Sequence, residues 1–276
     1  MKKVLIFILA LTTTQAFAKK NFEKQNKEIL EEGIRLYKSE KASWHGTDIF
    51  MERYKDKEKI GGYFSYVEDN IAKCIFFSKE DQPKVLGTIA FDSTYNIYTA
   101  EVDLKERVFT PLETSIYMIR QSTKKILKEN KDGFFRSYKN TNYNIIPLIH
   151  NNEKKVYIIT GSTQNGVTFL GNDYLLTFDK NNNLKKKTRL HQSLIPFEYE
   201  KASEGKEAMH THLPETGPLF TPTDICTLML YAPFAGWKQH IVYTKDYMSF
   251  WVSSGPKIAT VSNKVIKKIN KKSNNQ

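Results

Sequence analysis

Short apolar segments separated by polar turns run through most of this chain, and they restrict its fold more than any other feature. Four such segments lie between residues 62 and 104, five more between 144 and 197, and a hairpin pattern covers 240–252. Segments of this length and spacing are typical of antiparallel strands. Asn151-Asn152 and the run 181–183 supply residues that favour tight turns. We therefore expect antiparallel or mixed sheets.

Three segments have the pattern of helices instead. Residues 21–40 place Leu30, Ile34 and Tyr37 on one face. Residues 111–128 begin with a proline, and so do residues 222–232, which Pro233 should end. The chain is thus predicted to be an α+β protein with three main helices packed on its sheets.

We expect a signal peptide over 1–18, a helix plus β-sheet region over 19–135, an α+β region over 136–262 and a basic tail over 263–276. A boundary near residues 131–142 and a single intertwined domain are both compatible with the pattern. The 276 residues include 40% hydrophobic and 13% aromatic ones, which excludes a disordered or collagen-like chain. Two cysteines exclude a disulfide scaffold and leave pairing of Cys74 with Cys226 open.

Residues 1–18 have the three parts of a secretory signal peptide. Lys2 and Lys3 are followed by an apolar run and by Ala16-Phe17-Ala18, a typical cleavage site. The alternative is a buried N-terminal helix. No later segment is apolar for long enough to cross a membrane as a helix. The sequence therefore predicts an exported protein, periplasmic or secreted, without a transmembrane segment after signal removal.

The chain is basic, with a net charge of +12 that would fall to +10 on loss of Lys2 and Lys3. Its basic runs at 185–189 and 264–276 contain no aromatic residues, so we expect no nucleic-acid partner. An exported basic protein meets anionic envelope polymers and lipid head groups instead. The simpler interpretation of the charge, which we favour, is solubility.

One group of residues has the composition of a metal site. His210 and His212 would share a face if residues 208–212 form a strand, and adjacent imidazoles suit a divalent metal such as zinc. Thr221 stands where a helix N-cap should be, with Pro222 and Asp224 in the first turn. Two histidines and one carboxylate would leave a coordination position open for water, as catalytic zinc requires.

At these residues the sequence resembles the JAB/MPN (JAMM) metalloprotease superfamily, which carries His-x-His, a seven-residue loop beginning with proline, and Ser-x-x-Asp. The matching residues are His210, His212, Thr221 and Asp224. The resemblance implies a JAB/MPN-like C-terminal part, zinc bound by His210, His212 and Asp224, and Thr221 supporting the tetrahedral intermediate. The surrounding sequence also resembles an uncharacterised family of exported bacterial proteins, which implies no activity.

The chain departs from the JAB/MPN pattern in three places. Thr221 replaces the family's serine but keeps its hydroxyl. The loop over 213–220 has eight residues with Pro214 second, which fits one insertion after the second histidine. The glutamate that serves the family as general base has no counterpart, because residues 156–177 contain none. Glu113 lies at the start of a predicted helix and Glu153 in a predicted turn, so neither is assigned.

Simpler roles exist for each residue. The histidines can be polar residues beside a loop, Thr221 only a cap and Asp224 a favourable charge at a helix N-terminus. His240 is interpreted as a surface residue, with an extra ligand or supporting donor as the alternative. His45, His150 and His191 fit no ligand spacing.

Two functions follow from the sequence. The first is an exported zinc-binding peptidase or amidase that acts on a protein or peptide substrate. The alternative is a non-catalytic envelope or secreted binding protein, in which the His/Asp cluster is structural or a relic.

Overall fold

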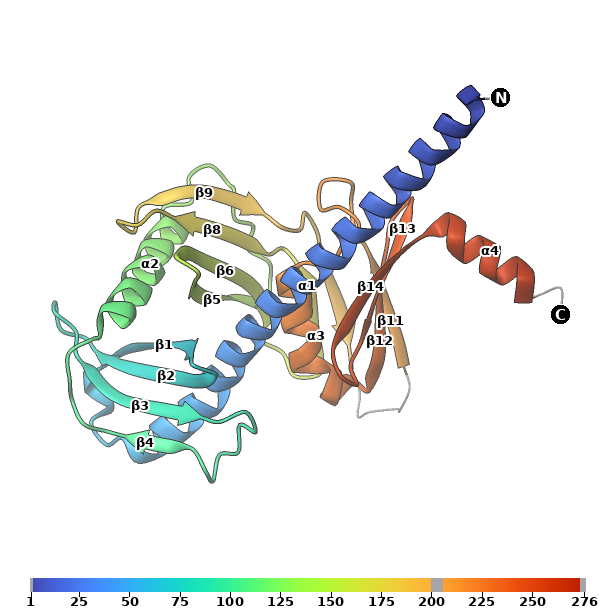
Figure 1. Ribbon diagram of the computed structural model, residues 1–276. Helices are drawn as coiled ribbons and strands as arrows, with labels where there is room; N and C mark the ends of the chain where they lie inside the picture. Colours follow the sequence, from blue (N-terminus) through green and yellow to red (C-terminus); the bar gives the residue numbers. More distant parts are fainter. Residues whose placement is uncertain (1, 200–205, 274–276) are drawn as a thin grey trace. The chain divides into compact units, whose positions relative to one another are not determined.

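The structure, a computed structural model, describes residues 2–199 and 206–273 and is an α+β fold (Figure 1). The chain divides into two compact units. The smaller unit consists of Met1–Gly33 and Glu200–Gln276, and the larger unit of Ile34–Tyr199. Helix α1 (Lys2–Arg53) contributes residues to both. No helix among the described residues combines the length and apolar character needed to cross a membrane.

The larger unit contains two four-stranded antiparallel sheets and a separate two-stranded ladder. The first sheet has the order β1-β2-β3-β4, with β1 (Ile60–Glu68), β2 (Ile71–Ser78), β3 (Val85–Phe91) and β4 (Glu101–Asp103). The second has the order β5-β6-β8-β9, with β5 (Thr141–His150), β6 (Glu153–Ser162), β8 (Tyr174–Phe178) and β9 (Leu184–Arg189). The ladder pairs β7 (Val167–Gly171) with β10 (Leu194–Glu198).

Helices cover both sheets of this unit with apolar side chains. Phe50 of α1 stacks on Phe76 of the first sheet, with ring centroids 3.8 Å apart. Helix α2 (Pro111–Lys128) packs Ile119 into the core of the second sheet and Ile116 into a core with β1 and β2. A Thr110 capping box, which includes the Glu113 carboxylate, begins the helix. The unit is thus held together by helices that bury one apolar face, as the sequence predicts.

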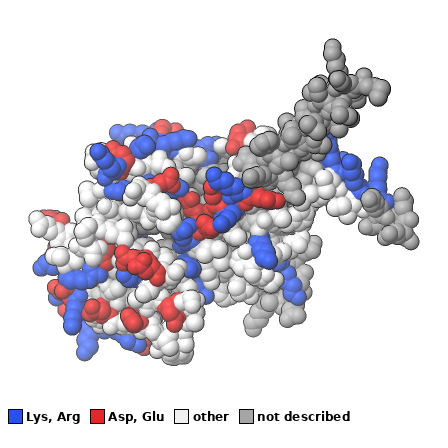
Figure 2. Space-filling model, viewed as in Figure 1, with Lys and Arg blue, Asp and Glu red and all other residues white. Residues whose placement is uncertain are grey.

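The smaller unit is built around a parallel crossover. Strand β11 (Lys206–Thr211) runs parallel to β12 (Trp237–Tyr243), and α3 (Pro222–Ala235) connects them. Antiparallel strands β13 (Tyr247–Val252) and β14 (Lys257–Ser262) complete the sheet in the order β11-β12-β13-β14. Helix α4 (Asn263–Ser273) follows, and Figure 2 shows basic side chains on it. The crossover places the end of β11 and the start of α3 in one unit.

Several predictions from the sequence are confirmed, and others are wrong at their boundaries. The α+β class, the α2 bounds and the Asn151-Asn152 turn, with φ of 49° and 60°, are confirmed. Helix α1 is longer than 21–40, because its later residues bury Ala42, Ile49 and Phe50. The segment 188–197 divides between β9 and β10, and strand β14 is present where the sequence pattern predicts no strand.

The predicted end of α3 and the predicted basic tail also differ from the structure. Helix α3 continues past Pro233, since a proline near the end removes only one helical hydrogen bond. Gly236, with φ of 67°, ends the helix.

The basic tail over 263–276 contains α4. Residues 131–142 lie within the larger unit. Cys74 and Cys226 are both buried free thiols.

Close packing of α1 on α3 depends on Gly33. A Cβ atom there would lie 2.5 Å from the Ile225 Cβ and 3.0 Å from the Pro222 carbonyl oxygen. We expect Gly33→Val to lower the free energy of unfolding by about 1–3 kcal/mol, because the helices must move apart. Chemical denaturation measures this. Glu31→Val adds the same side chain at an exposed position of α1 and should cost about 0.5 kcal/mol. Equal losses in both variants would contradict the packing argument.

Candidate metal centre

Strand β11 and the residue directly after it present two histidines on one face. His210 pairs in register with Val242 of β12, and the His212 backbone N–H donates to the Tyr243 carbonyl at 3.2 Å. Because side chains two residues apart in a strand point the same way, the two imidazole rings lie side by side, with centroids 4.7 Å apart. Both residues are buried. The predicted His-x-His arrangement is therefore present.

The start of α3 supplies the carboxylate. Thr221 is the N-cap, and its hydroxyl oxygen accepts the Asp224 backbone N–H at 3.1 Å. In return, Asp224 Oδ2 accepts the Thr221 backbone N–H at 2.8 Å and lies 2.9 Å from the Thr221 hydroxyl oxygen. This reciprocal capping box fixes the orientation of a carboxylate that is 0% exposed. Thr221 thus positions Asp224.

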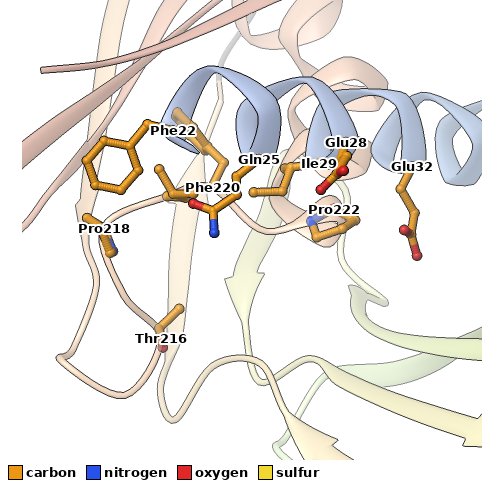
Figure 3. Close-up of a pocket in the computed structure, with 10 residues that line it drawn as sticks. Phe22, Gln25, Glu28, Ile29, Glu32, Thr216, Pro218, Phe220 and Pro222 are labelled. Carbon is orange, nitrogen blue, oxygen red and sulfur yellow. The ribbon is translucent and has the colours of Figure 1, made fainter. Parts of the chain in front are cut away.

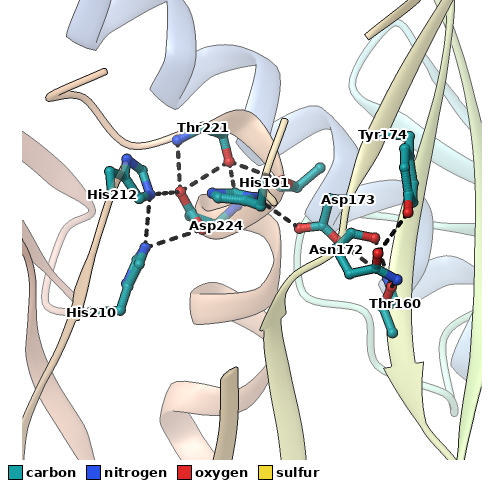
Figure 4. A network of polar contacts seen from close by, with 10 residues as sticks. Thr160, Asn172, Asp173, Tyr174, His191, His210, His212, Thr221 and Asp224 are labelled. Atoms are coloured by element: carbon teal, nitrogen blue, oxygen red, sulfur yellow. Dashed lines mark hydrogen bonds and ion pairs between the residues drawn. The ribbon is translucent and has the colours of Figure 1, made fainter. Parts of the chain in front are cut away.

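The two histidines and the carboxylate converge (Figure 4). Asp224 Oδ1 lies 3.7 Å from His210 Nε2, and Asp224 Oδ2 lies 3.5 Å from His212 Nε2. The two Nε2 atoms are 2.8 Å apart. Ligands bound to zinc at about 2.0–2.1 Å in a tetrahedron lie about 3.3 Å from one another, so small shifts bring all three to that spacing. These residues can hold a metal ion.

The other nitrogen of each imidazole faces a further partner. His212 Nδ1 lies 3.2 Å from the Gly217 carbonyl oxygen, which can only accept, so the His212 proton is on Nδ1 and Nε2 is an acceptor. His210 Nδ1 lies 2.7 Å from His240 Nε2. When the His210 proton is on Nδ1, both Nε2 lone pairs point towards Asp224. Partners of this kind orient metal-binding histidines.

His240 belongs to this cluster, contrary to its interpretation as a surface residue. It lies on β12 and is 0% exposed, because the parallel pairing of β11 and β12 places it behind His210. Burial lowers the pKa of His240 to about 4, although Asp224 opposes that shift. His240 is therefore a neutral imidazole at pH 7, able to accept a hydrogen bond from His210 Nδ1.

The loop between the histidines and α3 is anchored by a chain of hydrogen bonds. The Ser249 hydroxyl lies 2.7 Å from the Pro218 carbonyl oxygen and 2.7 Å from the Thr260 hydroxyl. The Asn26 side-chain amide donates to that threonine at 3.1 Å. Strands β13 and β14 and helix α1 thus hold the segment that connects the ligands.

A pocket of about 600 Å³ lies between this loop and α1 (Figure 3). Phe22 and Ile29 of α1 contribute apolar surface opposite Phe220 of the loop, and Glu32 lies at one end. The Phe220 ring centroid is also 6.4 Å from that of His210. The same loop therefore shapes the pocket and adjoins the metal ligands.

The remaining candidates lie in the larger unit. Glu113 accepts hydrogen bonds from Arg107 at 2.6 and 2.8 Å, and Glu153 is paired with Lys155 at 2.8 Å. Both carboxylates are thus taken by cations, and no general base is assigned. His191 is buried, with Nδ1 3.4 Å from Asp173 Oδ2 (Figure 4). No ligand spacing in the sequence singles out this histidine–aspartate pair.

Comparison of the chain with protein-family models, with curated proteins and with solved structures finds no match. The resemblance to the JAB/MPN superfamily stays a prediction from the motif residues. The geometry of the site is therefore the basis for any functional conclusion.

The capping box allows a test with a matched control. Thr221→Ala should lower the free energy of unfolding by about 1 kcal/mol through loss of the cap. It should also weaken zinc binding about 10- to 100-fold, because Asp224 loses its positioning partner. Thr110→Ala removes an equivalent capping box from α2 in the larger unit. Calorimetric zinc titration should show normal affinity in that control; equal weakening in both variants would contradict the positioning role.

Proposed function

We propose that this protein is an exported zinc-binding protein that hydrolyses peptide or amide bonds. The observation that carries the proposal is the convergence of His210 Nε2, His212 Nε2 and the Asp224 carboxylate, whose ligand atoms all lie within 4.8 Å of one another. Imidazole and carboxylate ligands suit zinc, and three protein ligands are typical of catalytic zinc sites. The signal-like residues 1–18 support export to the periplasm or beyond.

Each residue has a separate role in this proposal. His210 and His212 bind through Nε2, while His240 and the Gly217 carbonyl hold their other nitrogens. Asp224 contributes negative charge and is oriented by Thr221. A zinc ion held this way supplies Lewis-acid chemistry for hydrolysis. The pocket beside the loop offers apolar surface and carboxylates to a peptide side chain.

Thr221 has a second proposed role, support of the oxyanion, which follows only from the JAB/MPN resemblance. Its hydroxyl oxygen lies 2.9 Å from Asp224 Oδ2 and 2.9 Å from the Thr223 hydroxyl. The single hydroxyl proton has two acceptors within reach, so contact with a substrate would require it to leave them. The positioning role needs no such change.

Bound metal is the first quantity to measure. Protein beginning at Lys19 and purified without chelator should contain about one zinc per chain by mass spectrometry, and His210→Ala/His212→Ala should abolish it. His45→Ala/His150→Ala removes two histidines of the larger unit and should retain zinc. Absence of zinc after it is added back would contradict metal binding. Zinc loading without cleavage of peptide or isopeptide substrates would contradict only the hydrolytic step.

A second candidate function, binding to an anionic envelope surface, is favoured by helix α4. Successive helical residues are about 100° apart, which separates its lysines from its apolar residues. Val265 is 45% exposed and Ile269 is 56% exposed. Exposed lysines line the other side: Lys264, Lys267, Lys268 and Lys271. A basic amphipathic helix of this kind is typical of proteins that bind anionic lipid surfaces.

Charge removal from α4 tests this candidate. Lys267→Gln/Lys268→Gln should weaken binding to vesicles of anionic phospholipid about 30-fold, at about 1 kcal/mol per lysine. Vesicle co-sedimentation measures the effect. Lys185→Gln/Lys186→Gln makes the same charge change at exposed positions of β9 and should bind normally. Equal weakening in both variants, or no binding by the unaltered protein, would contradict a role for α4.

A further inference from the structure

A small polar cavity lies inside the larger unit, and it uses none of the candidate metal ligands. Its volume is about 60 Å³, and its walls come from α1, β1, α2 and β5. Glu40 and Arg120 contribute opposite charges to the lining. Uncharged polar side chains complete it: Ser39, Ser43, Tyr63, Ser65, Tyr143 and Asn144. Polar groups are thus concentrated at a cavity whose lining is only partly buried.

Two nitrogens of the Arg120 guanidinium lack hydrogen-bond acceptors at this cavity. Its Nε and Nη1 atoms are shielded from solvent and form no hydrogen bond with any described residue. The guanidinium carbon lies 5.8 Å from the centroid of the Tyr63 ring, a contact that supplies no acceptor atom. Burial lowers the pKa of Arg120, yet an arginine side chain stays protonated in proteins. Two shielded donors of a cation need acceptors, which an anion or waters can supply.

The Glu40 carboxyl group balances the Arg120 charge only in part. The side chain is buried, and neither Nε nor Nη1 of Arg120 forms a hydrogen bond with it. Burial raises the pKa of Glu40 to about 7, and the nearby Arg120 charge only partly opposes the shift. At neutral pH the carboxyl group is therefore protonated in a large fraction of molecules. In that form the carboxyl group can donate a hydrogen bond and no longer balances the guanidinium charge.

We propose that this cavity binds one small oxyanion, with Arg120 supplying the positive charge and protonated Glu40 donating a hydrogen bond. The serine pair can add a further donor: Ser43 Oγ and Ser65 Oγ lie 2.8 Å apart, and when Ser65 donates to Ser43 the Ser43 hydroxyl proton is left for the cavity. One water needs about 10–15 Å³ of such space, so the cavity accommodates about four waters or one sulfate- or acetate-sized ion. Waters alone are the competing occupant.

Titration calorimetry on the full mature chain tests the proposal, with sulfate and acetate as separate probes at constant ionic strength. We expect one binding site per chain for at least one probe. Arg120→Met keeps the length of the side chain and should abolish binding. Lys124→Met removes a cation one turn along α2 and should bind normally. Absence of binding by both probes, or equal loss in both variants, would overturn the proposal and leave waters as the occupant.

The pH dependence separates this site from a general anion effect. Sulfate keeps its charge between pH 6 and 8, so its affinity should fall about tenfold over that range as Glu40 loses its proton. Burial raises the pKa of the other groups near the cavity: that of Tyr63, and those of Cys74 and Tyr143 to about 12. Those groups and Arg120 keep their protonation throughout. Glu40→Gln should bind sulfate with a pH-independent affinity, and a pH dependence retained in that variant would overturn the role of Glu40.

Discussion

The capping box at the start of α3 is the interaction on which the candidate site depends. Thr221 and Asp224 satisfy each other's backbone N–H groups, so a requirement of every helix N-terminus is met by the side chain that also faces the two histidines. Asp224 cannot turn away without exposing unpaired donors. The carboxylate is thus held by helix formation itself, before any metal contributes.

The parallel crossover places a third histidine, His240, beside the two metal-ligand histidines. Because β12 runs parallel to β11, His240 lies beside His210, and their nitrogens are 2.7 Å apart. Buried imidazoles are costly unless their nitrogens have partners, and here each ring has a partner on the side remote from Asp224. The Nδ1 atoms of His210 and His212 are therefore both held, which keeps the Nε2 atoms of these two rings directed to one point. A metal site needs this organisation. The positions of these atoms indicate such a site without any resemblance to a known family.

Two buried carboxylates of the larger unit differ in how their charge is balanced. In the larger unit, Glu113 is neutralised by Arg107 within hydrogen-bond distance, which is the usual arrangement for a buried carboxylate. Glu40 and Arg120 instead both line a polar cavity, where Arg120 Nε and Nη1 form no hydrogen bond. The contrast indicates that the cavity is more than a consequence of packing, since a direct ion pair is available to this fold elsewhere.

The sequence by itself determined the α+β class, the bounds of α2, the His210–His212 pair on a strand and the Thr221 cap with Asp224, because these depend on residue spacing and local capping chemistry. It did not reveal His240, the Glu40–Arg120 cavity or the continuation of α3 past Pro233. Those features depend on strand order and on side chains that are distant along the chain. Tertiary structure alone decided them, because periodicity records which face a residue occupies but not which element packs against that face.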